Sequence, residues 1–125
     1  MTPFANPSAT PSKLVLGVDG GGSNTVAWLA ELDAEGNPRI VGRGCAGPSN
    51  PQAVGFDPAC EAILAATADA GRNADVPGGQ VASAVLSIAG AASPDERRRL
   101  ASWAMAQMQR TQVELVSDAE PILAA

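Results

Sequence analysis

The chain has 125 residues, 46% of them hydrophobic, with a net charge of -5, so its length suits one domain with a real core rather than two. It has no histidine and only two cysteines, which excludes Ser-His-Asp and Cys-His catalytic sites, histidine-rich zinc sites and a four-thiolate metal site within one chain. The negative charge argues against nucleic acid or an anionic membrane as the main partner.

The first residues, 1–12, read MTPFANPSATPS and contain three prolines but no apolar stretch of the kind found in signal peptides. We predict a disordered leader here. No later stretch approaches the roughly 18 uninterrupted apolar residues of a membrane helix. We therefore expect a cytoplasmic protein whose two cysteines, Cys45 and Cys60, are free thiols that fill the core. A single disulfide between them is the alternative.

Three strands are predicted next. Residues 13–19 (KLVLGVD) form a short apolar run rich in β-branched side chains, which is typical of a buried strand. Residues 25–32 (TVAWLAEL) alternate with a period of two. Residues 33–38 (DAEGNP) have the composition of a turn, and residues 39–47 (RIVGRGCAG) indicate a third strand. Short connections between them predict an antiparallel meander.

Helices and strands alternate in the second half. The segment 49–72 predicts a helix with Asp57 as its N-cap, Pro58 in its first turn and Gly71 at its end. Residues 80–91 predict a buried strand. A capping box of Ser93 and Glu96 starts a second helix over residues 93–109, with Pro94 at the first helical position and Leu100 and Ala104 on the buried face. Residues 111–117 predict a fifth strand, and residues 118–125 the start of a helix.

The predicted order is therefore three antiparallel strands followed by α-β-α-β-α. Antiparallel strands followed by parallel strands on crossover helices indicate an α/β fold of the ribonuclease-H-like type.

The stretch from Leu16 to Thr25, LGVDGGGSNT, carries the chemistry. Its three contiguous glycines precede a strand and no lysine follows, so it is neither a Walker loop nor a dinucleotide-binding loop. Glycine N–H groups and the hydroxyls of Ser23 and Thr25 can instead surround a phosphate, with Asp19 holding Mg²⁺ directly or through water. The alternative is a plain hairpin turn with Asp19 as its capping acid.

The same stretch resembles the first phosphate motif of the sugar kinase–actin–chaperone ATPase superfamily, in the branch of BadF-type ATPases that includes N-acetylglucosamine and glucosamine kinases. Three further segments agree with that branch in order. GCAGPSNPQAVG resembles its sugar-contacting segment, LSIAGAASPDERRRL its strand, glycine turn and helix, and LVSDAEPILAA the segment with the catalytic aspartate. The resemblance implies an actin-like ATPase lobe over residues 13–125, with the second lobe absent.

The resemblance also implies a role for each motif residue. Asp19 would lie on the metal side of the nucleotide and hold Mg²⁺. The residues that would bind the ATP phosphates are Gly20, Gly21, Gly22, Ser23, Asn24 and Thr25.

On the sugar side, the resemblance implies that Asn50 hydrogen-bonds a sugar hydroxyl and that Gly90 lies beside the sugar or the phosphoryl group. Asp118 would contact the sugar as the general base that takes a proton from the attacking hydroxyl. The alternatives are that Asn50 is a turn residue and that Asp118 only caps the following helix. Pro121 would then occupy the third helical position without an N–H, which weakens the capping alternative.

The implied function is an ATP- and Mg²⁺-dependent kinase that phosphorylates a small-molecule amino sugar, glucosamine or N-acetylglucosamine, at its 6-hydroxyl. Without a second lobe the chain alone is expected to be inactive, and a homodimer is left open. Two alternatives remain: an activator-type ATPase of the same family, and a non-catalytic sugar- or nucleotide-binding module.

Overall fold

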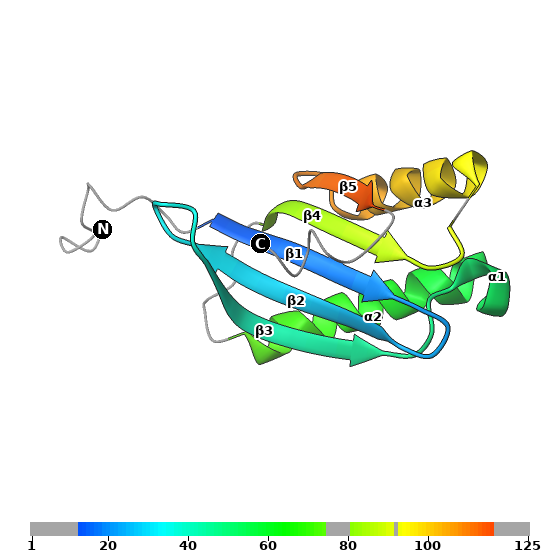
Figure 1. The fold of residues 1–125 in the computed structure, drawn as a ribbon, viewed down its shortest axis with the longest axis horizontal. Helices are drawn as coiled ribbons and strands as arrows, with labels where there is room; N and C mark the ends of the chain where they lie inside the picture. Colours follow the sequence, from blue (N-terminus) through cyan, green and yellow to red (C-terminus); the bar gives the residue numbers. More distant parts are fainter. Residues whose placement is uncertain (1–12, 75–80, 92, 117–125) are drawn as a thin grey trace.

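A computed structural model describes residues 13–74, 81–91 and 93–116. Its five strands form one sheet in the order β3-β2-β1-β4-β5 (Figure 1). In chain order the elements are β1 (Lys13–Gly20), β2 (Thr25–Leu32), β3 (Pro38–Ala46), α1 (Pro51–Val54), α2 (Phe56–Asn73), β4 (Val81–Ile88), α3 (Pro94–Gln107) and β5 (Gln112–Val116).

The strand pairing confirms the predicted meander. β1 pairs antiparallel with β2 from Lys13 opposite Leu32 to Gly20 opposite Thr25, and β2 pairs antiparallel with β3. β4 then pairs parallel with the other edge of β1, and β5 pairs parallel with β4. All five predicted strands are present; the helix predicted over residues 118–125 lies outside the described residues.

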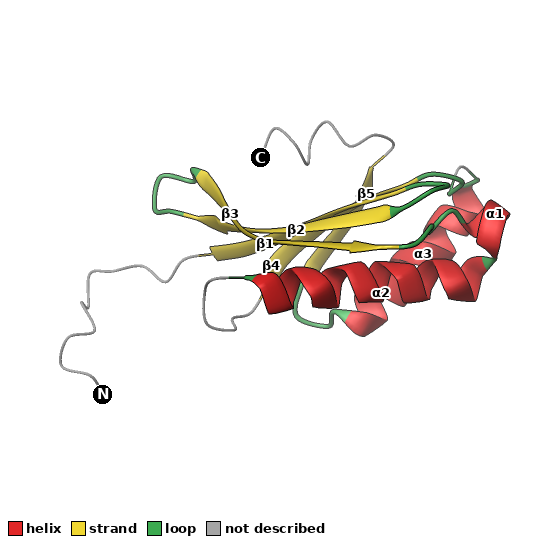
Figure 2. Cartoon of the chain, turned by 90° about the horizontal axis from the view of Figure 1, so that it is seen from below, coloured by secondary structure: helices red, strands yellow, loops and turns green. Residues whose placement is uncertain are grey.

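Both long helices cover the same face of the sheet (Figure 2). Alternate residues of β1, namely Leu14, Leu16 and Val18, point to that face and are buried with side chains from α2 and α3. Ile63 of α2 and Leu100 of α3 are both 0% exposed. Because side chains alternate along a strand, the residues between them, including Asp19, face the opposite side, which no described helix covers.

Two glycines of β3 let α2 lie close to the sheet. A Cβ atom on Gly42 would overlap the carbonyl oxygen of Ala70, and one on Gly44 would overlap the backbone of Ala66 and Ala70. Ala66 and Ala70 are fully buried, so small residues meet on both sides of this contact. The helix therefore packs on the strand at backbone distance.

Polar side chains of α2 also cover the free edge of β3. The Asp69 Oδ2 atom accepts a hydrogen bond from the Cys45 N–H at 3.0 Å, and the Asn73 Nδ2 atom donates to the Arg43 carbonyl at 2.8 Å. The Cys45 N–H, together with Arg72, lowers the pKa of Asp69. These bonds occupy backbone groups that an edge strand otherwise leaves unpaired.

The helix limits differ from the prediction at three points. Asn50 caps a short helix, α1, that was not predicted, and α2 begins at Phe56 rather than after Asp57 because Gly55, at φ 95°, turns the chain between the two helices. The helix α2 also continues past Gly71 to Asn73, whose side chain is bonded to β3. The third helix, α3, begins as predicted: Ser93 Oγ accepts a hydrogen bond from the Glu96 N–H at 3.1 Å.

The two cysteines are free, but only Cys60 fills the core. The prediction for Cys45 was wrong, because Gly44 and Ala46 face α2 and Cys45 therefore points to the open face, where it is exposed. No helix among the described residues is long and apolar enough to cross a membrane.

Replacing Gly44 with alanine tests the close contact between β3 and α2. We expect Gly44→Ala to lower the free energy of unfolding by about 1–3 kcal/mol, because the added methyl group overlaps backbone that cannot rotate away. Gly71→Ala is the control: its Cβ has open space, and in a helix it should raise that free energy by about 0.4–1 kcal/mol. Urea denaturation followed by circular dichroism measures both, and equal stabilities of the two variants would contradict the packing.

The two thiols should differ sharply in reactivity. Burial, followed by the nearby Asp57 carboxylate, raises the pKa of Cys60 to about 11. At pH 8 its thiolate fraction is then roughly 10²-fold below that of an ordinary cysteine. We expect Ellman's reagent to modify one thiol rapidly in the folded protein and the second only after unfolding, with mass spectrometry placing the first label on Cys45. Rapid labelling of Cys60 in the folded protein would contradict its placement in the core.

Candidate functional site

Three connections meet at one end of the sheet, on the right in Figure 1. They are the β1–β2 loop (residues 21–24), the segment between β3 and α1 (residues 47–50) and the turn between β4 and α3 (residues 89–91). Two backbone hydrogen bonds join them: the Ser49 N–H donates to the Gly21 carbonyl at 3.1 Å, and the Ala89 N–H donates to the Gly20 carbonyl at 2.8 Å. This end holds the carboxyl ends of the parallel strands, where open α/β sheets bind ligands.

The middle of the glycine loop is open backbone. Gly22, Ser23 and Asn24 are exposed, and the Gly21 N–H closes the loop by donating to the Asn24 carbonyl at 2.9 Å. Neither Gly21 nor Gly22 has a positive φ, and a Cβ on Gly22 would meet nothing within 4 Å. Neither a backbone angle nor a contact with the described residues therefore requires glycine at these two positions.

The residues at the two ends of the loop are buried, unlike its middle. Gly20 is buried, and a Cβ there would overlap the Ser49 side chain. Thr25 is 0% exposed, and its hydroxyl oxygen lies 2.7 Å from the Gly47 carbonyl and 2.7 Å from Ser49 Oγ. Of the residues predicted to bind phosphate, residues 21–24 thus form the accessible loop, while Gly20 and Thr25 anchor it.

Asp19 lies at the end of β1 on the open face, with Val26 and Ser87 as its neighbours across the sheet. It is partly exposed, and no described residue hydrogen-bonds or ion-pairs with its carboxylate. The described residues contain no cluster of three or more acidic, cysteine or histidine side chains that could hold a metal. A cation at Asp19 would therefore need its other ligands from outside the described residues, and oxygen atoms of phosphate and water would suit Mg²⁺.

The structure brings Asn50 and Gly90 together. Asn50 Oδ1 accepts a hydrogen bond from the Gln52 N–H at 2.9 Å and so caps α1. Gly90 has φ 85°, and a Cβ on it would overlap the Asn50 side chain. The Nδ2 group of Asn50 has no hydrogen-bond partner among the described residues. Asn50 is therefore a capping residue that still has a donor available to a ligand.

One residue of the site was not predicted, and one predicted residue is not described. Ser49, which sequence reasoning missed, is fully buried between the loop and Asn50; its position directly before Asn50 was the only available signal. Asp118, the predicted base, lies outside the described residues. β5 runs parallel to β4 with Val116 opposite Ser87. The strand that precedes Asp118 in the sequence therefore ends at the same end of the sheet as β4.

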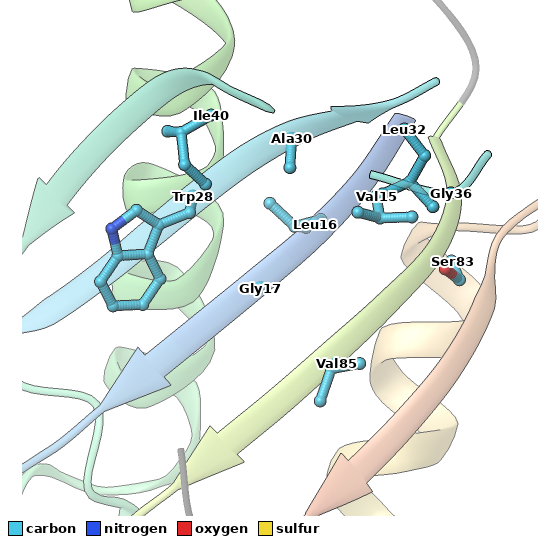
Figure 3. A pocket seen from close by; sticks show the side chains of 10 residues that line it. All are labelled: Val15, Leu16, Gly17, Trp28, Ala30, Leu32, Gly36, Ile40, Ser83 and Val85. Carbon is cyan, nitrogen blue, oxygen red and sulfur yellow. The ribbon is translucent and has the colours of Figure 1, made fainter. Parts of the chain in front are cut away.

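The open face also carries an apolar pocket of about 250 Å³, which Figure 3 shows. It lies over the first halves of β1 and β4, away from the glycine loop. Its lining includes Val15, Trp28, Ile40 and Val85, and Ser83 supplies a polar side chain. This pocket offers few groups for a phosphate or a sugar. The candidate site is therefore the group of three connections at the other end of the sheet, residues 21–24, 47–50 and 89–91, which we call the loop cluster.

Among solved structures, the chain is similar to a proposed N-acetylglucosamine kinase from Chromobacterium violaceum, with a TM-score of 0.56 and 22% identity over 82% of this chain. The match confirms the predicted α/β fold of the ribonuclease-H-like type, and at this identity it establishes the fold alone. The match spans 35% of that protein's length.

A second solved structure, that of diol dehydratase-reactivating factor in its nucleotide-free form, aligns with 60% of this chain and 12% of its own. Its TM-score of 0.48, at 23% identity, is too low to support an inference about this chain. No protein-family model and no curated protein sequence matches the chain.

Proposed function

We propose that this chain is one lobe of an ATP- and Mg²⁺-dependent amino-sugar kinase of the BadF type, acting on the 6-hydroxyl of glucosamine or N-acetylglucosamine. One observation carries the proposal. No contact with a described residue and no positive φ requires Gly21 or Gly22 to lack a side chain, and both follow Asp19, whose carboxylate pairs with no described residue. A phosphate that must approach the backbone closely supplies the missing reason.

The loop has the donors that a phosphate needs. The N–H groups of Gly22 and Ser23 form no hydrogen bond with described residues, and the Ser23 side chain is exposed beside them. Successive N–H groups of this kind make a concave anion site. Asp19 would hold Mg²⁺ directly or through water, and the ion would neutralise charge on the phosphates.

The acceptor sugar would lie on the other side of the loop cluster. Asn50 Nδ2 would donate to a sugar hydroxyl, and Gly90 would leave room beside it. Asp118 would take the proton from the attacking hydroxyl. Phosphoryl transfer asks the protein mainly for such positioning and charge neutralisation, and a well-placed base typically adds about 10²–10⁴-fold to the rate.

A complete site would need the rest of a kinase. The chain corresponds to 35% of the length of the Chromobacterium violaceum kinase, so the second wall of the cleft would come from a part that this sequence lacks. Activity tests therefore belong on the full-length natural protein that contains this chain.

The function is tested by ADP release from Mg-ATP with glucosamine, N-acetylglucosamine, glucose or no sugar. We expect release that depends on one of the amino sugars, because ADP leaves only when a bound sugar hydroxyl accepts the γ-phosphoryl group and gives its proton to the base. Asp118→Asn should lower turnover by about 10²–10⁴-fold while leaving the sugar affinity nearly unchanged. Sugar-independent release would favour the activator-type ATPase, and binding without release the non-catalytic module; either result would refute the kinase.

A separate prediction concerns the glycine loop. Gly22→Val should weaken Mg-ATP binding by about tenfold or more, because a branched side chain would occupy the space proposed for a phosphate. Its effect on stability should be small, since a Cβ at this position meets nothing within 4 Å. Gly71→Val on α2 also adds a side chain in open space and serves as the control. Calorimetric titration of both variants measures the affinities; equal affinities would exclude the loop as the phosphate site.

A further inference from the structure

A pair of buried hydroxyl groups makes a hydrogen bond inside the loop cluster. Thr25 and Ser49 are both 0% exposed, and their oxygens lie 2.7 Å apart. Thr25 Oγ1 also lies 2.7 Å from the Gly47 carbonyl, which can only accept. Because a threonine hydroxyl has a single hydrogen, Thr25 donates to Gly47 and the Ser49 hydroxyl supplies the hydrogen between the pair. Removing either hydroxyl therefore leaves the other without this hydrogen-bond partner.

Ser49 contacts the glycine loop at both of its ends. Besides the bond to Thr25, its N–H donates to the Gly21 carbonyl at 3.1 Å. Its side chain also fills the space that a Cβ on Gly20 would need. A change in the position of the loop would therefore alter the contacts of Ser49.

Asn50 follows Ser49 directly in the chain and completes a ring of contacts. Its side chain lies against Gly90, and the next residue back in that turn, Ala89, donates to the Gly20 carbonyl at 2.8 Å. The ring thus runs from the glycine loop through Ser49 and Asn50 to the β4–α3 turn and back to the loop. Only one residue separates the loop from Asn50.

We infer that the Thr25–Ser49 hydroxyl pair couples the phosphate-binding loop (residues 21–24) to the sugar-binding part of the site around Asn50. A nucleotide bound to the loop then changes the affinity of the protein for the sugar. The inference rests on the proposed function and adds a regulation of that site to it. Thr25 and Ser49 are positioning residues: both are buried, and they act on ligands through the loop and through Asn50. Because coupling between two sites is reciprocal, sugar changes nucleotide affinity by the same factor.

The test measures the sugar dissociation constant of the full-length protein by calorimetry, with and without saturating Mg-ADP, for N-acetylglucosamine and for glucosamine. We expect Mg-ADP to change the affinity for one of the sugars by about 5–150-fold in the natural protein. Thr25→Val keeps the shape of the side chain but removes its hydroxyl, and it should reduce this factor to about twofold or less. Thr25→Ser keeps the hydroxyl and should retain the factor, which a purely structural role of the methyl group would not predict.

Ser49→Ala provides a second, gentler variant. It leaves the Ser49 N–H bond to Gly21 and the Thr25 bond to Gly47 in place, so it should fold, as circular dichroism would show, and it should also lose the coupling. A natural coupling factor in Thr25→Val or Ser49→Ala would overturn the inference. So would a natural protein in which Mg-ADP leaves sugar affinity unchanged, although the kinase proposal would then stand. A natural protein that binds neither ligand would overturn both.

Discussion

The alternation of side chains along β1 is the constraint on which the rest of the structure depends. Leu14, Leu16 and Val18 are buried under the helices, and this fixes the register of the central strand against both of its neighbours. A slip of one residue would expose these three side chains and bury Asp19. The same register directs Gly20 toward Ser49. The hydrophobic core therefore determines where the carboxylate and the glycine loop lie.

The described glycines can be grouped by the physical reason for which each position lacks a side chain. Gly36, Gly55 and Gly90 have positive φ angles, which favour glycine over other residues. Gly20, Gly42 and Gly44 lie where a Cβ would overlap a neighbouring residue. Gly21, Gly22, Gly47 and Gly71 belong to neither group. Of these four, Gly21 and Gly22 are consecutive and lie in the β1–β2 loop, at the end of the sheet where ligands bind in related architectures. Under the proposed function, a phosphate that approaches the backbone would account for Gly21 and Gly22.

Local sequence patterns predicted most of the fold. Period-two alternation located β2, and the capping box located the start of α3 at Ser93, because both signals depend on residues close in sequence. The unpredicted features depend on distant contacts. The exposure of Cys45 follows from which face α2 covers, and α2 passes Gly71 while Asn73 bonds to β3. The burial of Thr25 depends on Ser49, 24 residues away, which no local pattern reveals. The predicted base, Asp118, lies outside the described residues.

The central claim is that the glycine loop holds the phosphates of a nucleotide, with Asp19 on the metal side. A crystal structure of the full-length protein with Mg²⁺ and a non-hydrolysable ATP analogue tests it most directly. The account predicts phosphate oxygens within hydrogen-bonding distance of the Gly22 and Ser23 N–H groups, and the ion bound to Asp19 directly or through one water. Phosphates bound elsewhere, with the loop facing only solvent, would contradict it.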